Sequence, residues 1–206
     1  MNMKTDFELY NLYLAGDGAS YDELMIRYGD AITVYLNGYL HNLQDAEDLM
    51  IEAFARIMVK KPSIRDGGFK AYLYKTARNL ATRFHIRKSR METFSLDSME
   101  EESRSLIEAE ITSGRGIPGA PRPTESAGPE QEILDKEEYK LLHLCLENIE
   151  PELKEALWLV YASGMSYSDA ARIMKVSNKR IDRLIQRGKD RMRQELSKEG
   201  VAYANQ

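Results

Sequence analysis

Two stretches in the first half of the chain decide its fold. Residues 45–54 read DAEDLMIEAF and residues 69–90 read FKAYLYKTARNLATRFHIRKSR, with Gly67–Gly68 between them. In both stretches apolar residues recur every three or four positions, which is the spacing of one face of an α-helix. Each stretch is therefore predicted to form an amphipathic helix with one buried side.

Local signals predict where the helices of this half begin and end. Ser20 with Glu23 has the S-x-x-E pattern of a capping box, and apolar residues follow it at helical spacing. Asp45 with Asp48 offers the start of a second helix, which Pro62 ends. A third helix then starts at the glycine pair.

The second half of the chain also predicts only helices. One covers residues 133–146, and the next begins at Pro151 and ends at Gly164, because Pro suits a first helical position and Gly a helix exit. Since no run of alternating residues is bounded well enough to be a strand, the fold class is predicted to be all-α.

A helix-turn-helix is predicted between residues 166 and 196. Ala171, Lys175 and Ile181 have its spacing: a small residue lets two helices cross closely, the turn position usually prefers Gly, and a branched residue seats the second helix on the first. Ser166 and Ser177 are the predicted caps of its two helices.

A linker is predicted between two domains. Residues 112–129 contain four Gly and four Pro, a density that no regular element tolerates. We therefore predict an N-terminal helical domain over 1–92, a C-terminal helical domain over 131–206, and a flexible linker over 93–130 that is acidic first and rich in Gly and Pro after.

The net charge of −4 conceals two basic segments. Residues 56–90 hold eleven Lys or Arg against one Asp, and residues 172–193 hold nine against two Asp. An acidic stretch, residues 92–110, carries seven Asp or Glu against one Arg. Because charges are screened over about 10 Å at 0.1 M salt, a phosphate responds to the nearer basic segment, and both segments favour nucleic acid as a partner.

Several classes of protein are disfavoured by composition. No apolar run is long enough to span a bilayer, and the first residues have no export signal. A lone Cys145 excludes an internal disulfide and fits the cytoplasm. His41, His85 and His143 are scattered, so we expect no catalytic residues, no metal site and no cofactor.

The stretch 69–90 is predicted to hold a displaced single strand of nucleic acid. Cations follow a phosphate backbone, and aromatic rings stack unpaired bases at about 1–3 kcal/mol each. The predicted contact residues are Tyr72, Lys75, Arg78, Asn79, Arg83 and Arg87, with Tyr74, Phe84 and His85 interleaved. The alternative is a solvated basic face with aromatic residues in the core, which we favour for Phe69 and Phe84.

The second helix of the helix-turn-helix is predicted to read duplex DNA. Recognition helices meet base edges near their N-termini, which here carry Ser177, Asn178, Lys179, Arg180 and Arg183. Arg187, further along, is placed to meet phosphates. The alternative is a plain helical hairpin with a basic exterior.

Four acidic residues head the helix that begins near residue 45. They are Asp45, Glu47, Asp48 and Glu52. Carboxylates are favourable at a helix N-terminus, and they also suit a docking face for a basic partner. The residues alone leave these two interpretations open.

Together these segments resemble the extracytoplasmic-function (ECF) sigma factors of bacteria, over residues 8–90 and 134–196. The resemblance is carried by D-A-E-D-L at Asp45–Leu49, F-K-A-Y-L-x-x-x-A-R-N at Phe69–Asn79, E-P-E-L-K-E-A-L at Glu150–Leu157 and G-M-S-Y-S-D-A-A at Gly164–Ala171. Tyr72 stands where the family usually has Trp, and Arg83 where it commonly has Asp.

The resemblance implies an alternative sigma factor that directs core RNA polymerase to a subset of promoters. The helix from Asp45 to Lys60 would dock on the coiled-coil clamp of the β′ subunit, and the linker would lie in polymerase channels. The partner would be bacterial core RNA polymerase, through its β′ and β subunits. Residues 69–90 would melt and hold the −10 element, and residues 166–193 would read the −35 element. The resemblance also implies an anti-sigma factor as partner. We expect a monomer when free, without membrane insertion.

Two rival functions are weighed against this one. A self-sufficient helix-turn-helix regulator would need a dimer on paired half-sites, and no heptad seam supports one. An enzyme would need a chemical constellation, and the paired carboxylates have the simpler explanation of helix capping.

Overall fold

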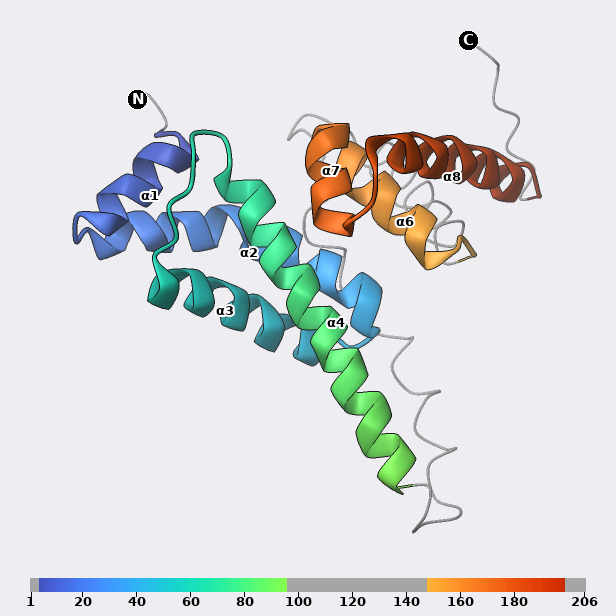
Figure 1. The fold of residues 1–206 in the computed structure, drawn as a ribbon, viewed down its shortest axis with the longest axis horizontal. Coiled ribbons are helices and arrows are strands. Elements are labelled where there is room, and N and C mark those ends of the chain that lie inside the picture. The colour runs from blue at the N-terminus through green and yellow to red at the C-terminus, as the bar shows by residue number, and fades with distance from the viewer. Residues whose placement is uncertain (1–3, 96–147, 199–206) are drawn as a thin grey trace, which may run out of the picture. The chain divides into compact units, whose positions relative to one another are not determined.

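A computed structural model describes residues 4–95 and 148–198, and residues 91–95 only as helical backbone (Figure 1). The chain divides into two compact units, Met1–Gly119 and Ala120–Gln206. Every regular element within the described ranges is helical, which confirms the all-α prediction. The predicted helix 133–146 and the linker lie outside the described residues, and the domain limits at 92 and 131 remain a prediction.

The first unit is built from helices that pack around one apolar core. They are α1 (Asp6–Leu14), α2 (Gly18–Leu40), α3 (Leu43–Lys60) and α4 (Phe69–Ser95). Helix α4 packs against α2, α3 and α1. Its side chains Phe69, Leu73, Ala77 and Leu80 are all buried, as their spacing predicts. Phe84, at the end of that series, is half-buried.

Two predicted helix starts in this unit are wrong by a few residues. The cap of α2 is Asp17, whose carboxylate accepts hydrogen bonds from the backbone N–H of Ala19 (3.1 Å) and from the hydroxyl of Ser20 (2.6 Å). The cap of α3 is Asn42, which accepts from the N–H of Asp45 at 3.1 Å. Asp and Asn are both strong N-caps, so in each case the earlier residue begins the helix.

Helix α1 was not predicted, although its start carries a clear signal. Thr5 and Glu8 form a reciprocal capping box: the Glu8 N–H donates to Thr5 Oγ1 at 3.2 Å, and the Thr5 N–H donates to Glu8 Oε2 at 2.7 Å. This is the same S/T-x-x-E pattern that was assigned to residues 20–23.

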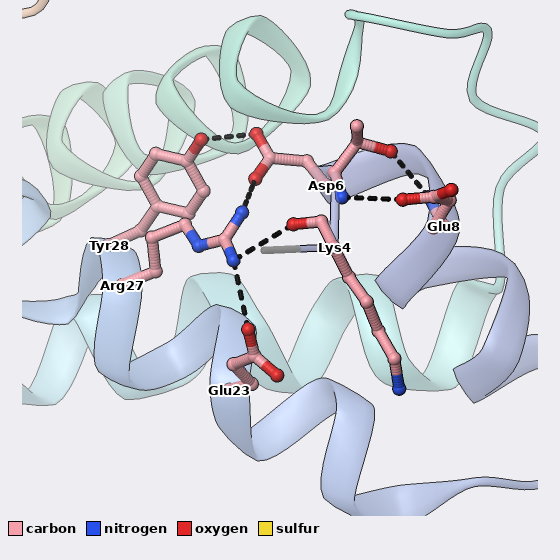
Figure 2. A network of polar contacts seen from close by, with 7 residues as sticks. Lys4, Asp6, Glu8, Glu23, Arg27 and Tyr28 are labelled. Atoms are coloured by element: carbon pink, nitrogen blue, oxygen red, sulfur yellow. Dashed lines mark hydrogen bonds and ion pairs between the residues drawn. The ribbon is translucent and has the colours of Figure 1, made fainter. Parts of the chain in front are cut away.

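A polar network attaches the N-terminus to α2 (Figure 2). Arg27 donates from Nη1 to Asp6 at 2.6 Å, and from Nη2 to Glu23 at 2.9 Å and to the carbonyl of Lys4 at 3.1 Å. The Tyr28 hydroxyl also donates to Asp6. Burial raises the pKa of Tyr28, and the Asp6 carboxylate raises it further, so the phenol stays protonated and keeps donating.

The second unit contains the predicted helix-turn-helix. Its elements are α6 (Pro151–Leu157), the π-helical turn η1 (Trp158–Ala162), α7 (Tyr167–Met174) and α8 (Asn178–Lys198). Pro151 occupies the start of α6 and Gly164 has a φ of +60° after η1, as predicted. Ala171 and Ile181 are buried where α7 meets α8.

Both predicted caps of the helix-turn-helix are present. Ser166 Oγ accepts from the N–H of Asp169 at 3.1 Å, and Ser177 Oγ accepts from the N–H of Arg180 at 3.2 Å. Lys175 ends α7 in the left-handed region, with a φ of +59°. This conformation explains why the turn position usually prefers Gly, since a side chain there meets the following carbonyl.

Helices α6 and α8 cross closely at Gly188. A Cβ at this position would lie 3.0 Å from Leu157 Cγ and Cδ1. Gly188 thus suits the close approach of the two helices, which here involves Leu157, the last residue of α6.

We expect Lys175→Gly to stabilise the second unit. Left-handed backbone costs an L-residue about 1–2 kcal/mol, and the extra freedom of Gly in the unfolded chain offsets about 0.4–1 kcal/mol. The net gain should be at most about 1.6 kcal/mol in the free energy of unfolding, and about 0.8 kcal/mol at the middle of both ranges. Urea unfolding followed by the fluorescence of Trp158, the chain's single Trp, reports on this unit. Lys175→Ala keeps the strained backbone, so an equal gain from Ala would contradict the explanation.

We expect Gly188→Ala to destabilise the same unit by about 1–3 kcal/mol, because the new methyl group overpacks the crossing with Leu157. The same Trp158 transition measures the effect. Gly38→Ala is the matched control, since its Cβ would have no neighbour within 4 Å and its helix, α2, is in the other unit. A Gly188→Ala variant as stable as the parent chain would show that the crossing is not tight.

Candidate nucleic-acid interface

The outer side of α4 is polar and partly basic. Because Phe69, Leu73, Ala77 and Leu80 are buried, residues about half a turn away face outward. The predicted residues on that side are Tyr72, Lys75, Asn79 and Arg83, of which Arg83 is exposed and the others are half-buried. One ring and two cations therefore share one face of the helix.

One of the interleaved side chains is buried, and a second is held by a hydrogen bond. Tyr74 is 1% exposed, and its ring centroid lies 5.0 Å from that of Tyr35 in the core. The His85 Nε2 lies 2.9 Å from the carbonyl oxygen of Tyr39, which ties this ring to the end of α2. For Tyr74 the core interpretation is thus the right one.

The last predicted cation of α4 lies on a different side from the others. Arg87 follows Leu80 by seven residues, about two helical turns, so it continues the side that Leu73 and Leu80 bury. Arg87 is nevertheless exposed, and no side chain between Thr82 and Arg90 is buried. Figure 1 shows α4 continuing past the helices on which it packs. The Arg87 guanidinium lies 5.8 Å from the centroid of the Phe84 ring. Arg87 therefore does not share the outer side of α4 with Tyr72, Lys75, Asn79 and Arg83.

Helix α8 presents a basic surface opposite its buried side. Ile181, Leu184, Ile185 and Gly188 are buried against the rest of the unit. Asn178, Lys179 and Arg183 are exposed in the first two turns of α8, and Gln186, which was not predicted, is exposed at the start of the third. Its spacing could have predicted this position, because Lys179, Arg183 and Gln186 recur at helical intervals and so share one side of the helix.

Arg180 is not an independent cation. Its Nε donates to Glu152 Oε1 at 3.1 Å, and its Nη2 donates to Glu152 Oε1 and Oε2 at 2.8 and 2.9 Å. Arg180 lies on the flank of α8 that faces the start of α6, which explains why sequence spacing alone could not separate it from Lys179 and Arg183.

A second glutamate at the start of α6 approaches the same helix. Glu150 lies 3.5 Å from Arg191 Nη2. A hydrogen bond from its own backbone lowers the pKa of Glu150, and the charges of Arg191 and Arg187 lower it further. This carboxylate therefore stays ionised beside the basic helix.

The acidic residues of α3 differ in their surroundings. Only Asp45 lies in the first helical turn, where the helix dipole acts. Glu52 pairs with Arg56 at 2.6 Å on the same helix. Glu47 and Asp48 are exposed beyond that first turn. A role at the helix start therefore explains the acidic residue at position 45 but not the one at position 48.

Apolar side chains accompany Asp48 on the exposed side of α3. Ile51 is 54% exposed, Met58 41% and Val59 82%. Met58 follows the buried Phe54 by four residues but is itself exposed, and the sequence had not singled out Ile51 and Val59. The sequence could have revealed these residues, because they are apolar but do not share the helical spacing of Leu49, Ala53 and Ile57, which are buried.

Other kinds of site were also sought. Within residues 4–95 and 148–198, no group of three His, Cys, Asp or Glu side chains is placed to hold a metal ion. No helix in the same ranges has both the length and the apolar character to cross a membrane.

Two family models match this chain, one in each unit. The model for Sigma-70 region 2 matches residues 24–91, and the model for Sigma-70, region 4 matches residues 139–192. The first match contains most of α2, all of α3 and most of α4, and the second contains the helix-turn-helix.

Known sigma factors match most of this chain. The RNA polymerase sigma-H factor of Pseudomonas aeruginosa is 27% identical over 176 residues, a match that covers 85% of this chain and 85% of that protein. The ECF RNA polymerase sigma-E factor of Escherichia coli K12 is 26% identical over 172 residues, which are 82% of this chain and 83% of that protein.

Solved structures share the fold. CnrH, in complex with the cytosolic domain of CnrY, matches with a TM-score of 0.59 and 15% identity over 94% of this chain and 98% of that one. The sigma factor RpoE of Bartonella quintana, in complex with the anti-sigma factor NepR, matches with a TM-score of 0.55 and 22% identity over 86% and 96%.

The helix-turn-helix, the basic outward faces and the two matched regions lead to one assignment. The relatives are named sigma factors and are matched over 83–85% of their length, and no catalytic activity is indicated for the family. A self-sufficient regulator is not favoured, because the region 2 half has no place in one. This chain belongs to the extracytoplasmic-function sigma factors, the alternative sigma factors that direct transcription initiation by RNA polymerase.

Proposed function

We propose that three outward helix faces divide the work of initiation. The exposed side of α3 binds core RNA polymerase, the outer side of α4 holds the −10 strand, and the first turns of α8 read the −35 element. In this scheme residues 1–92 and 131–206 are separate functional domains, and 93–130 joins them. The observation that carries the proposal is that α4 and α8 each bury an apolar side and present cations on the other.

The docking face on α3 combines exposed acid with exposed apolar surface. Asp48, Ile51 and Met58 follow one another at helical spacing on the side away from the core. Protein interfaces bury an apolar centre with a polar rim, and acidic residues favour a basic partner surface. This combination fits the β′ clamp that the family resemblance implies. Asp45 belongs mainly to the helix start, while Glu47 lies at the edge of the face and Glu52 is shared with Arg56.

The outer side of α4 suits an unpaired strand. Tyr72 offers a ring on which a base can stack, and Lys75 and Arg83 offer charge to the backbone. Asn79 lies between them on the same side, where its amide can donate and accept hydrogen bonds. Arg78 flanks this side, and Arg87 lies on another side of the helix beyond the core; both are assigned to phosphates.

The start of α8 suits the major groove of a duplex. Lys179 and Arg183 are exposed, have no ion pair with another described residue, and lie where base edges are read. Asn178 and Ser177 lie at the same end, although the Ser177 hydroxyl already caps the helix. Arg187 lies a turn further on and is assigned to the phosphate backbone.

The remaining partners are proposed from the same family. RpoE of Bartonella quintana is described with an anti-sigma factor, which supports an anti-sigma factor for this chain as well. We propose that the free protein is a cytoplasmic monomer without cofactor, metal or catalytic residues of its own. Core polymerase, through β′ and β, then sets the distance between the two DNA-binding faces.

We expect Asp48→Arg with Ile51→Ser to weaken binding to core polymerase by about tenfold or more, since an interface anchor contributes on the order of 1–2 kcal/mol. Titration of labelled protein with purified core enzyme measures the loss. Asp30→Arg is the matched control, because Asp30 is an exposed acid in the middle of α2. Equal binding by the double variant and the control would remove α3 from the interface.

We expect Lys179→Ala with Arg183→Ala to abolish selection of the −35 element while core binding is kept. Truncating each base-reading side chain should cost about 1–3 kcal/mol of discrimination. Run-off transcription from a pool of genomic fragments measures promoter choice. Lys198→Ala, at the far end of α8, should leave that choice unchanged. If the double variant selects the same promoters as the parent, α8 is not the reading helix.

A further inference from the structure

The start of the recognition helix is joined to another helix by an ion pair. Arg180 lies in the first turn of α8, and Glu152 lies in the first turn of α6. The contacts of 2.8, 2.9 and 3.1 Å run from Nη2 and Nε of Arg180 to both carboxylate oxygens. An arginine that donates two parallel N–H groups to one carboxylate forms a bidentate ion pair, which is a strong geometry for this kind of contact.

This pair is open to solvent. The Arg180 side chain is 57% exposed and that of Glu152 is 43% exposed. Exposed ion pairs contribute little to folding stability, so the main physical effect of this one is geometric. A long side chain that otherwise samples many rotamers is held in one direction.

The ion pair with Glu152 uses only part of the Arg180 guanidinium. Arginine has five N–H donors, and the contacts to Glu152 use Nε and Nη2. The Nη1 group, with two hydrogens, makes none of these contacts. Guanine presents O6 and N7 in the major groove, and arginine donors on that edge are the commonest base-specific contact.

We propose that Glu152 is a positioning residue for promoter reading, holding Arg180 so that its free edge recognises a guanine of the −35 element. The inference rests on the proposed role of α8. Glu152 itself touches no base in this scheme. Its carboxylate also repels phosphate from the same place, which disfavours a non-specific position of Arg180 on the backbone.

Glu150 supplies a control for the effect of charge. It lies two residues earlier, at the start of the same helix, and approaches a different arginine, Arg191, through a single contact of 3.5 Å. Glu150→Gln and Glu152→Gln each remove one negative charge from this helix end. Only the second removes the two-pronged contact with Arg180.

The test uses holoenzyme formed from purified core polymerase and the full-length chain. Parent, Glu152→Gln, Glu150→Gln and Arg180→Lys proteins select from a pool of duplex promoter fragments randomised over the upstream element. The parent should enrich a guanine at one position, and an arginine–guanine pair discriminates about 5- to 150-fold. Glu152→Gln and Arg180→Lys should each reduce that preference by about fivefold or more, and the double variant should lose little beyond either single one. Glu150→Gln should keep the preference.

Two results would overturn the inference. Tighter binding of Glu152→Gln to all fragments with an unchanged base preference would show that the carboxylate only masks charge. An unchanged preference in Arg180→Lys would show that Arg180 is not a reader. Should Glu152→Gln not fold, Arg180→Lys tests the same contact without altering α6.

The same pool separates this inference from the function on which it rests. If Lys179→Ala with Arg183→Ala also leaves upstream selection intact, the proposed role of α8 fails. If that variant loses selection while Glu152→Gln keeps it, only the positioning role of Glu152 fails.

Discussion

The constraint on which the rest of this structure depends is the burial of one side of each long helix. Phe69, Leu73 and Leu80 hold α4 against its neighbours, and Ile181 and Ile185 do the same for α8. A helix that is fixed along one side presents the opposite side to solvent. The basic residues need no contacts of their own to face solvent, because the buried apolar residues fix the orientation of each helix.

In the second unit a single close contact has consequences for the surface. Helices α6 and α8 approach at Gly188, where a Cβ would lie 3.0 Å from Leu157 Cγ and Cδ1, which is tighter than such contacts usually are. This approach places Glu150 and Glu152 beside the recognition helix, so that two of its arginines have acidic neighbours. Packing in the core thus divides the cations of α8 into a paired group, Arg180 and Arg191, and an outward group that includes Lys179 and Arg183.

In the first unit the structure separates two explanations for the acidic residues of α3. Asn42 caps the helix, and the helix dipole accounts for Asp45. Asp48 lies further along and beside exposed Ile51, where neither capping nor an ion pair with another described residue accounts for it. A face that combines charge with exposed apolar surface is expected of a docking site, and this is the physical basis for assigning α3 to the polymerase.

The sequence by itself determined the all-α class, the helix-turn-helix and the family, because helical periodicity, capping residues and the spacing of Ala171, Lys175 and Ile181 are local properties. It also placed the basic surfaces on the right helices. It missed α1 and misplaced two helix starts, since several residues compete locally to be the cap. Only the tertiary structure decided that Tyr74 belongs to the core and that Arg180 is held by Glu152. Those outcomes depend on which helix packs against which, over separations of tens of residues, and spacing along one helix carries no information about its neighbours.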